Sequence, residues 1–142
     1  MHKIFGTRED VGYWDREGAY FIPCCNGMVA VVQTEKGYFF LGGGLKNGES
    51  HLACIKRECI EESGYVPHIK AKVCSAEAFM KPPEIGYFHP IQTYYCGELW
   101  KKVSTPTEKG HVLFWVAYDQ LKGKMCLEMR NWALEQLCLY VK

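Results

Sequence analysis

The spacing of hydrophobic and polar positions changes several times along the chain and predicts the order of its elements. Residues 19–25 and 28–34 are two apolar runs separated by Asn26-Gly27. Asn-Gly between such runs is the strongest short-range signal of a β-hairpin. Pro23 cannot donate a backbone hydrogen bond, so we expect the first run to be an edge strand or an irregular one.

Beyond this hairpin, the pattern predicts more strands and two helical segments. After a turn at residues 35–37, residues 38–41 predict a short strand. Three later segments are rich in aromatic and β-branched residues and are expected to be extended: 68–79, 91–100 and 111–118. Residues 119–121 predict a turn of helix, and 127–141 predict the last helix. Its imperfect apolar stripe consists of Leu127, Arg130, Leu134, Leu137, Leu139 and Tyr140.

A well-delimited helix is predicted between the two groups of strands. Ser50 can cap its first turn, and Gly64 can end it in a left-handed conformation, so the helix should cover residues 51–63. The order of strands, helix, strands and terminal helix indicates a single α/β domain over residues 1–142.

Three carboxylates crowd the end of this helix. Glu58, Glu61 and Glu62 are related by i, i+3 and i+4, so they share one face. Like charges at this spacing repel, and the helix macrodipole prefers cations in the last turn. A divalent cation removes both penalties, because hard cations such as Mg²⁺ bind carboxylates together with substrate phosphates. The alternative is a solvated charged face.

The surrounding residues make this helix specific. Residues 42–66 read GGGLKNGESHLACIKRECIEESGYV, with the spacing G-x5-E-x7-R-E-U-x-E-E-x-G-U, where U is apolar. The members of the pattern are Gly43, Glu49, Arg57, Glu58, Glu61, Glu62 and Gly64. This spacing resembles the Nudix box of the Nudix hydrolases, which cleave a diphosphate bond in a nucleoside diphosphate linked to another group. The resemblance implies the Nudix fold, a mixed β-sheet sandwiched between α-helices.

The resemblance also implies roles for individual residues. The expected metal ligands are Glu58, Glu61, Glu62 and the carbonyl of Gly42, binding Mg²⁺ or, as an alternative, Mn²⁺. Arg57 is expected to pair with Glu49 and to hold the glycine loop on the helix. The glycines of the motif are Gly43 and Gly44 in the loop and Gly64 at the helix end. Leu41 stands where many relatives have proline.

The base that activates water is left open by the sequence. In MutT-type relatives, the loop before a late strand often supplies a further glutamate, and Glu108 matches that position, with Glu98 as runner-up. An exposed loop glutamate is the equally weighted alternative. The implied catalytic set is Glu58, Glu61, Glu62, Arg57, Glu49 and Glu108.

The resemblance implies that the substrate is a small nucleotide. The chain length and the segment 108–121 favour a MutT-like nucleoside triphosphate pyrophosphatase, a group that includes enzymes acting on oxidised nucleotides such as 8-oxo-dGTP. ADP-ribose or a nucleotide sugar is the alternative, weakly indicated by Pro82-Pro83. A non-catalytic nucleotide-binding regulator is the alternative of another class. Aromatic residues that could stack on a base are Phe79, Tyr87, Phe88 and Tyr94, although strand aromatics are more often core.

Composition and charge add few constraints. The net charge of +1 gives no reason to expect binding to nucleic acid or a membrane, and no apolar run reaches spanning length. Without an apolar signal segment, we expect a cytoplasmic protein. The eight cysteines lack zinc spacing, so most are expected to be reduced and buried. Many relatives are dimers, which leaves a homodimer open.

Overall fold

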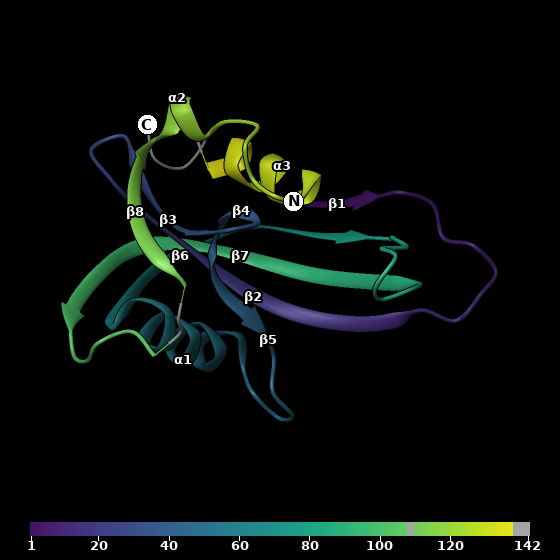
Figure 1. Cartoon of the computed structure of the whole chain (residues 1–142), viewed down its shortest axis with the longest axis horizontal. Coiled ribbons are helices and arrows are strands. Elements are labelled where there is room, and N and C mark those ends of the chain that lie inside the picture. Colours follow the sequence, from purple (N-terminus) through teal and green to yellow (C-terminus); the bar gives the residue numbers. More distant parts are fainter. Residues whose placement is uncertain (108–109, 138–142) are drawn as a thin grey trace.

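A mixed sheet runs through the centre of the molecule, with a helix on each face (Figure 1). The computed structural model describes residues 1–107 and 110–137. Its strands are β1 (His2–Phe5), β2 (Trp14–Cys25), β3 (Met28–Thr34), β4 (Gly37–Phe39), β5 (Leu41–Gly44), β6 (Tyr65–Ala78), β7 (Phe88–Lys102) and β8 (Val112–Ala117). Its helices are α1 (His51–Ser63), α2 (Tyr118–Leu121) and α3 (Glu128–Leu137). This is the mixed sheet between helices that the sequence predicted.

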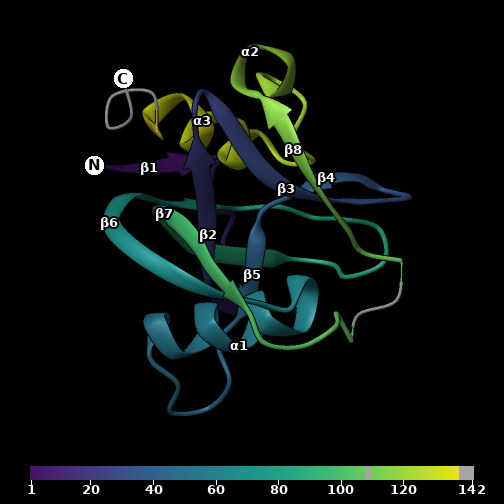
Figure 2. The same ribbon diagram turned by 90° about the vertical axis from the view of Figure 1, so that its left-hand side faces the viewer.

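The strands follow the order β1-β6-β7-β2-β3-β4, while β5 pairs with β2 and β8 pairs with β3. Parallel pairs join β1 to β6 and β2 to β7, and the other pairs are antiparallel. The view turned by 90° shows α1 and α3 on opposite sides of the strands (Figure 2). The α1 helix packs on β5, β2 and β6, and α3 packs on β6.

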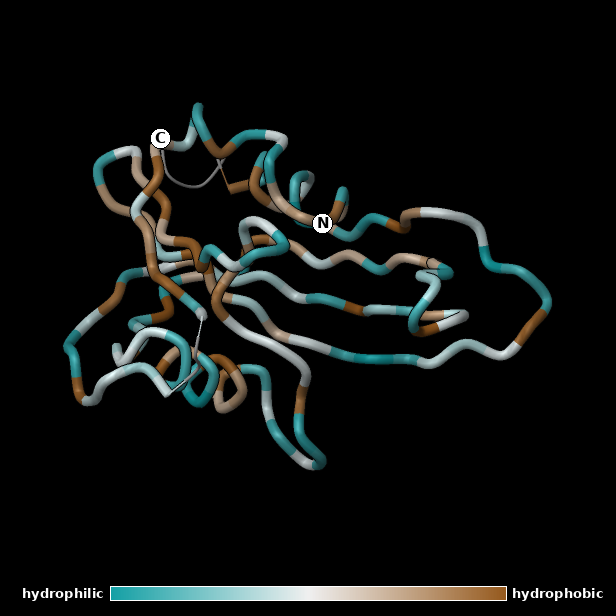
Figure 3. Tube along the Cα trace, in the orientation of Figure 1, coloured by the Kyte–Doolittle hydropathy of each residue, from teal (hydrophilic) through white to brown (hydrophobic). Residues whose placement is uncertain are grey.

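Strand β2 explains why both faces of the sheet are covered. Ala19 and Phe21 belong to a core cluster that also contains Ile55 of α1. The intervening residues Tyr20 and Ile22 belong to the cluster on the α3 side. A strand that is apolar at every position, rather than at alternate ones, is buried on both faces. In Figure 3, hydrophobic residues are concentrated in the part of the sheet that lies between α1 and α3.

The predicted hairpin is confirmed, and of the two alternatives for its first strand, edge or irregular, the irregular one is correct. Asn26 and Gly27 both have positive φ, 52° and 74°, in the turn between β2 and β3. Pro23 does not lie in an edge strand, because β2 pairs with β7 on one side and with β5 and then β3 on the other. The partner of β2 changes from β5 to β3 around Pro23, so the strand is irregular there.

Two other strands differ from the prediction. The strand expected at 38–41 is two strands, β4 and β5, which pair with different partners. Strand β1 was missed because its pairing with residues 75–78 of β6 is long-range and its residues are mostly exposed. The end of the last predicted helix, with Leu139 and Tyr140, lies outside the described residues.

The described cysteines agree with a reduced protein. Cys54, Cys59, Cys74 and Cys96 are buried, and the seven cysteines that the structure describes are all free. Burial raises the pKa of Cys59 to about 11 and that of Cys74 to about 12. These thiols therefore behave as small core side chains. Among the described helices, none is long and apolar enough to cross a membrane.

Candidate active site

Helix α1 begins and ends at the predicted residues. The Ser50 side chain accepts a hydrogen bond from the Ala53 N–H at 3.2 Å. At the other end, Gly64 has φ 80° and donates its N–H to the Ile60 carbonyl at 2.8 Å. A side chain at Gly64 would also collide with the Ser104 carbonyl, so glycine is required here for two reasons. The caps therefore determine the register of the glutamates on α1.

Arg57 connects the glycine loop to the helix. Its Nε and Nη2 donate to the two carboxylate oxygens of Glu49, at 2.8 and 2.9 Å. Its Nη1 donates to Glu58 at 2.7 Å and lies 3.6 Å from a Glu61 oxygen. Its Nη2 also donates to the Gly44 carbonyl at 3.2 Å. The contact with Glu49 is bidentate, which is the strongest arrangement for an arginine–carboxylate pair, and it holds the loop on α1.

The ionisation of this pair is well defined. Hydrogen bonding from Arg57, followed by that from the Lys46 N–H, lowers the pKa of Glu49 to about 2. Hydrogen bonding to Glu49 in turn raises the pKa of Arg57 above its already high ordinary value. Both groups are therefore charged across the neutral and mildly acidic range, so the connection between loop and helix persists there.

The loop glycines allow the carboxylates to reach the backbone. Gly42 has φ 125° and donates its N–H to a Glu62 oxygen at 2.9 Å. A Cβ atom at Gly43 would lie 2.9 Å from the Glu58 carboxyl carbon, which is too close for any real side chain. Glycine at both positions is thus needed for Glu58 and Glu62 to lie against the loop.

His111, the residue before β8, lies beside Glu62. Its Nδ1 is 3.6 Å from a Glu62 oxygen, beyond hydrogen-bond distance, and Glu62 itself is buried. Nδ1 is shielded from solvent and has no hydrogen-bond partner among the residues that the structure describes. This residue was not predicted from the sequence.

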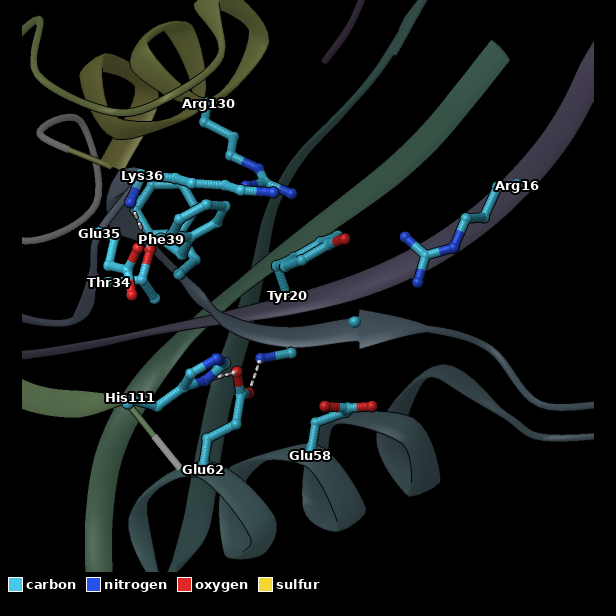
Figure 4. Close-up of a pocket in the computed structure, with 14 residues that line it drawn as sticks. Arg16, Tyr20, Thr34, Glu35, Lys36, Phe39, Glu58, Glu62, His111 and Arg130 are labelled. Carbon is cyan, nitrogen blue, oxygen red and sulfur yellow. Dashed lines mark hydrogen bonds and ion pairs between the residues drawn. The ribbon is translucent and has the colours of Figure 1, made fainter. Parts of the chain in front are cut away.

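A pocket of about 590 Å³ opens where the chain passes from β4 to β5 (Figure 4). On one side, Glu58 and Glu62 rise from α1 beside the glycine loop and His111. On the other side, Arg130 extends from α3. The remaining lining residues are Arg16, Tyr20, Thr34, Glu35, Lys36, Phe39, Phe40, Gly42, Gly43 and Gly110. Glu35 also lines the pocket, beside Lys36. The two carboxylates on α1, together with the basic side chains of the other walls, suit a phosphorylated ligand with a bound cation.

The donors on the α1 side match the chemistry of a hard cation. Carboxylate and backbone carbonyl oxygens are the ligands that Mg²⁺ prefers. Among residues 1–107 and 110–137, however, no three acidic, histidine or cysteine side chains converge as a metal site. Glu58 is turned to Arg57 and Glu62 to the Gly42 N–H. The donor set fits Mg²⁺, and side-chain rotations are required before these carboxylates bind it together.

The structure places the predicted site residues in two layers. Glu58, Glu62, Gly42 and Gly43 line the pocket. Behind them are Arg57, Glu49, Glu61 and Gly44, with Gly64 at the end of α1. Glu108, the candidate base, lies outside the described residues. Glu98 is an exposed residue of β7, where it pairs with Lys70 at 2.9 Å, and it does not line this pocket.

The opposite wall of the pocket was not predicted. The aromatic residues proposed for stacking, Phe79, Tyr87, Phe88 and Tyr94, do not line it; Tyr94 is fully buried, and Phe79 stacks on His89. Instead, Tyr20, Phe39 and Phe40 supply its aromatic surface. Arg130 was seen only as a member of an apolar stripe. An arginine within such a stripe was the one available signal.

Comparison with known proteins identifies the same fold and motif. A model of the NUDIX domain matches residues 16–137. No curated protein matches the chain by sequence. Among solved structures, a NUDIX hydrolase from Nitrosomonas europaea has a TM-score of 0.73 at 14% identity, over 89% of this chain and 90% of its own.

Two further solved structures share this fold. A MutT NUDIX hydrolase from Burkholderia pseudomallei has a TM-score of 0.73 at 19% identity, over 87% of this chain and 98% of its own. The NUDIX domain of Shewanella oneidensis NrtR, complexed with ADP ribose, has a TM-score of 0.67 at 13% identity, over 93% and 90%. At these identities the likeness concerns the fold, and it does not select a substrate.

Proposed function

Since this chain belongs to the Nudix family of pyrophosphohydrolases, we propose that it is a MutT-like, Mg²⁺-dependent nucleoside triphosphate pyrophosphohydrolase. One observation carries the proposal: Glu58 and Glu62 face a pocket whose other walls carry the basic side chains of Arg16 and Lys36. This distribution of charge can hold a cation and a phosphate chain together. Oxidised nucleotides such as 8-oxo-dGTP are within the proposed substrate class, and Mn²⁺ is the alternative cation.

The proposed metal ligands are Glu58, Glu61, Glu62 and the Gly42 carbonyl. When bound, Mg²⁺ neutralises phosphate charge and lowers the pKa of coordinated water. Arg57 does not react; it positions Glu58 and holds the loop through Glu49. The proton of the attacking water passes to one of the box glutamates or to Glu108. Glu62 is well placed for this role because the Gly42 N–H fixes one of its oxygens while the other faces His111.

The direct test is phosphate and pyrophosphate release from a panel of nucleotides, with Mg²⁺, with Mn²⁺ and with chelator. The panel contains normal dNTPs, 8-oxo-dGTP, ADP-ribose, nucleotide sugars and dinucleoside polyphosphates. Glu62→Gln should reduce turnover by about 100-fold or more. The matched control is Glu98→Gln, which removes an exposed carboxylate outside the pocket and should leave turnover unchanged.

ADP-ribose or a nucleotide sugar is the second candidate substrate. The NrtR domain that shares this fold is complexed with ADP ribose, and the pocket volume of about 590 Å³ is within the range of small-molecule sites. Release of AMP from ADP-ribose, without turnover of triphosphates, would favour this candidate. Nucleotide binding without turnover of any compound would favour a non-catalytic regulator.

The remaining proposals concern partners and location. We infer a cytoplasmic protein that binds neither nucleic acid nor membranes stably, in agreement with the net charge of +1 and the free cysteines. We propose a homodimer because many members of the family are dimers. Sedimentation equilibrium of the purified chain tests it.

A further inference from the structure

Arg130 is a buried guanidinium in the wall of the pocket opposite the glutamates. Only 7% of the residue is exposed, yet it lines the cavity. Its Cζ lies 4.8 Å from the centre of the Tyr20 ring and 5.5 Å from that of Phe39. Figure 4 shows the side chain extending from α3 into the pocket, on the side opposite Glu58 and Glu62. Two aromatic rings therefore hold the flat face of the guanidinium.

Among the described residues, the polar contacts of Arg130 are made with uncharged side chains. Its Nε donates to the side-chain oxygen of Gln92 at 3.3 Å, and the Tyr94 hydroxyl donates to the same oxygen at 2.6 Å. In the described part of the chain, no carboxylate forms an ion pair with Arg130. A buried cation is costly unless it is paired, so this arrangement favours an acceptor supplied by a ligand.

The shape of the guanidinium and its aromatic neighbours limit the kinds of ligand group that can bind beside Arg130. A guanidinium presents two parallel N–H donors in a rigid plane, which match two acceptors on a planar group. The surrounding rings of Tyr20, Phe39 and Phe40 suit a flat base rather than a hydrated phosphate. The phosphate chain has its own place near Glu58 and Glu62 under the proposed function, on which this inference rests.

We propose that Arg130 forms the base subsite and selects a 6-oxopurine. The O6 and N7 atoms of guanine or hypoxanthine offer a pair of acceptors to the guanidinium fork. Adenine keeps N7 but carries an amino group at position 6, whose hydrogens face the donors of Arg130. A bidentate contact of this kind discriminates between bases by roughly ten- to a hundredfold. The site therefore prefers guanine-type nucleotides over adenine nucleotides.

The test compares four nucleotides that differ in this edge alone or nearly so. Dissociation constants of the wild-type chain for GTP, ITP, 7-deaza-GTP and ATP are measured in chelator, where no turnover occurs. GTP and ITP should bind about equally, since both keep O6 and N7. ATP should bind at least tenfold more weakly, and 7-deaza-GTP should fall between them. Equal binding of GTP and ATP, or no binding of any of the four, overturns the proposal.

Arg130→Lys separates base recognition from phosphate recognition, because lysine keeps the charge but loses the planar fork. We expect this variant to bind GTP and ATP about equally, through loss of GTP affinity. The matched control is Arg8→Lys, at another arginine that lies over two aromatic rings outside the pocket. A preference for GTP that survives Arg130→Lys overturns the proposal. A second result would also overturn it: Arg130→Lys keeps full affinity, while Arg130→Gln loses the same factor of affinity for every nucleotide. That result would indicate that Arg130 binds phosphate.

The base panel on the wild-type chain does not depend on the folding of any variant, so it can refute the inference by itself. The outcomes also separate this inference from the proposed function. Preference for GTP without turnover would keep the base subsite and refute the hydrolase. Mg²⁺-dependent turnover of GTP and ATP at equal kcat/KM would keep the hydrolase and refute the base subsite.

Discussion

Two arginines near the pocket, Arg57 and Arg130, differ in the partners that surround their guanidinium groups. Arg57 is surrounded by carboxylates and donates to Glu49 and Glu58, so its hydrogen bonds are made within the protein. Arg130 is held by aromatic rings and by the amide oxygen of Gln92. The first arrangement makes a rigid connection between two segments. The second holds a guanidinium in the wall of the pocket, where a ligand can supply further hydrogen-bond acceptors. An arginine near a pocket can thus be structural or ligand-binding, and its partners distinguish the two roles.

The largest effect in this comparison is expected from Arg57→Ala. The variant frees the glycine loop from α1 and leaves Glu49 and Glu58 without their cation, so turnover should fall about 10- to 100-fold, as for other residues that orient metal ligands. The loss should be equal for all bases, because Arg57 does not line the pocket. Steady-state kcat/KM for GTP and ATP measures it. A change in the ratio between the two nucleotides would contradict a purely positioning role.

A smaller effect is expected from Gly43→Ala. The added Cβ would lie 2.9 Å from the Glu58 carboxyl carbon, so the carboxylate or the loop has to move. We expect a loss of about tenfold in kcat/KM with little loss of folding stability, because the flexible side chain can rotate away. The control is Gly12→Ala, since a Cβ at Gly12 meets nothing within 4 Å. Activity unchanged in Gly43→Ala would show that Glu58 does not need this approach to the loop.

Acid should weaken the contact between Arg57 and Glu49. The folded pKa of Glu49 is about 2, below its ordinary value of 4.5. The pair therefore stabilises the folded state above pH 4.5, and this contribution is lost as the pH falls towards 2. In urea unfolding under chelator, stability should decline more steeply over this window in the wild-type chain than in Glu49→Gln. Parallel curves would mean that the pair adds no stability.

A second carboxylate far from the pocket titrates in the same direction. Hydrogen bonds from His89, followed by those from His2, lower the pKa of Glu77. Its stabilising contribution is also present above the ordinary pKa and is lost in acid. Glu77→Gln should therefore flatten the acid limb of stability without changing kcat at neutral pH. Glu49→Gln should change both the acid limb of stability and kcat. The two variants therefore distinguish the histidine contacts of Glu77, which affect stability alone, from the Glu49 contact with Arg57, which also affects catalysis.

The sequence predicted the α1 side of the site well because its determinants are local. Ser50 and Gly64 are sufficient to set the ends of the helix, and they place the glutamates in register. The pairing of Arg57 with Glu49, implied by the resemblance, is confirmed at 2.8 Å. These residues lie within one short segment of the chain.

The opposite wall could not be predicted because distant segments build it. Arg16 comes from β2, Lys36 from the turn before β4, and Arg130 from α3. Their convergence depends on strand pairings such as β2 with β7, which periodicity does not reveal. The same limit explains why strand β1 was missed and why Glu98 was named as runner-up to Glu108, although Glu98 pairs with Lys70 elsewhere on the sheet.

The most direct test of these separate roles is Mg²⁺-dependent pyrophosphate release from GTP and ATP by three proteins: the wild-type chain, Arg57→Ala and Arg130→Lys. We predict that Arg57→Ala lowers kcat/KM for both nucleotides by the same factor. Arg130→Lys should lower kcat/KM for GTP alone and bring it to the value for ATP. If both variants lower both values equally, or if chelator leaves turnover of the wild-type chain unchanged, the account is wrong.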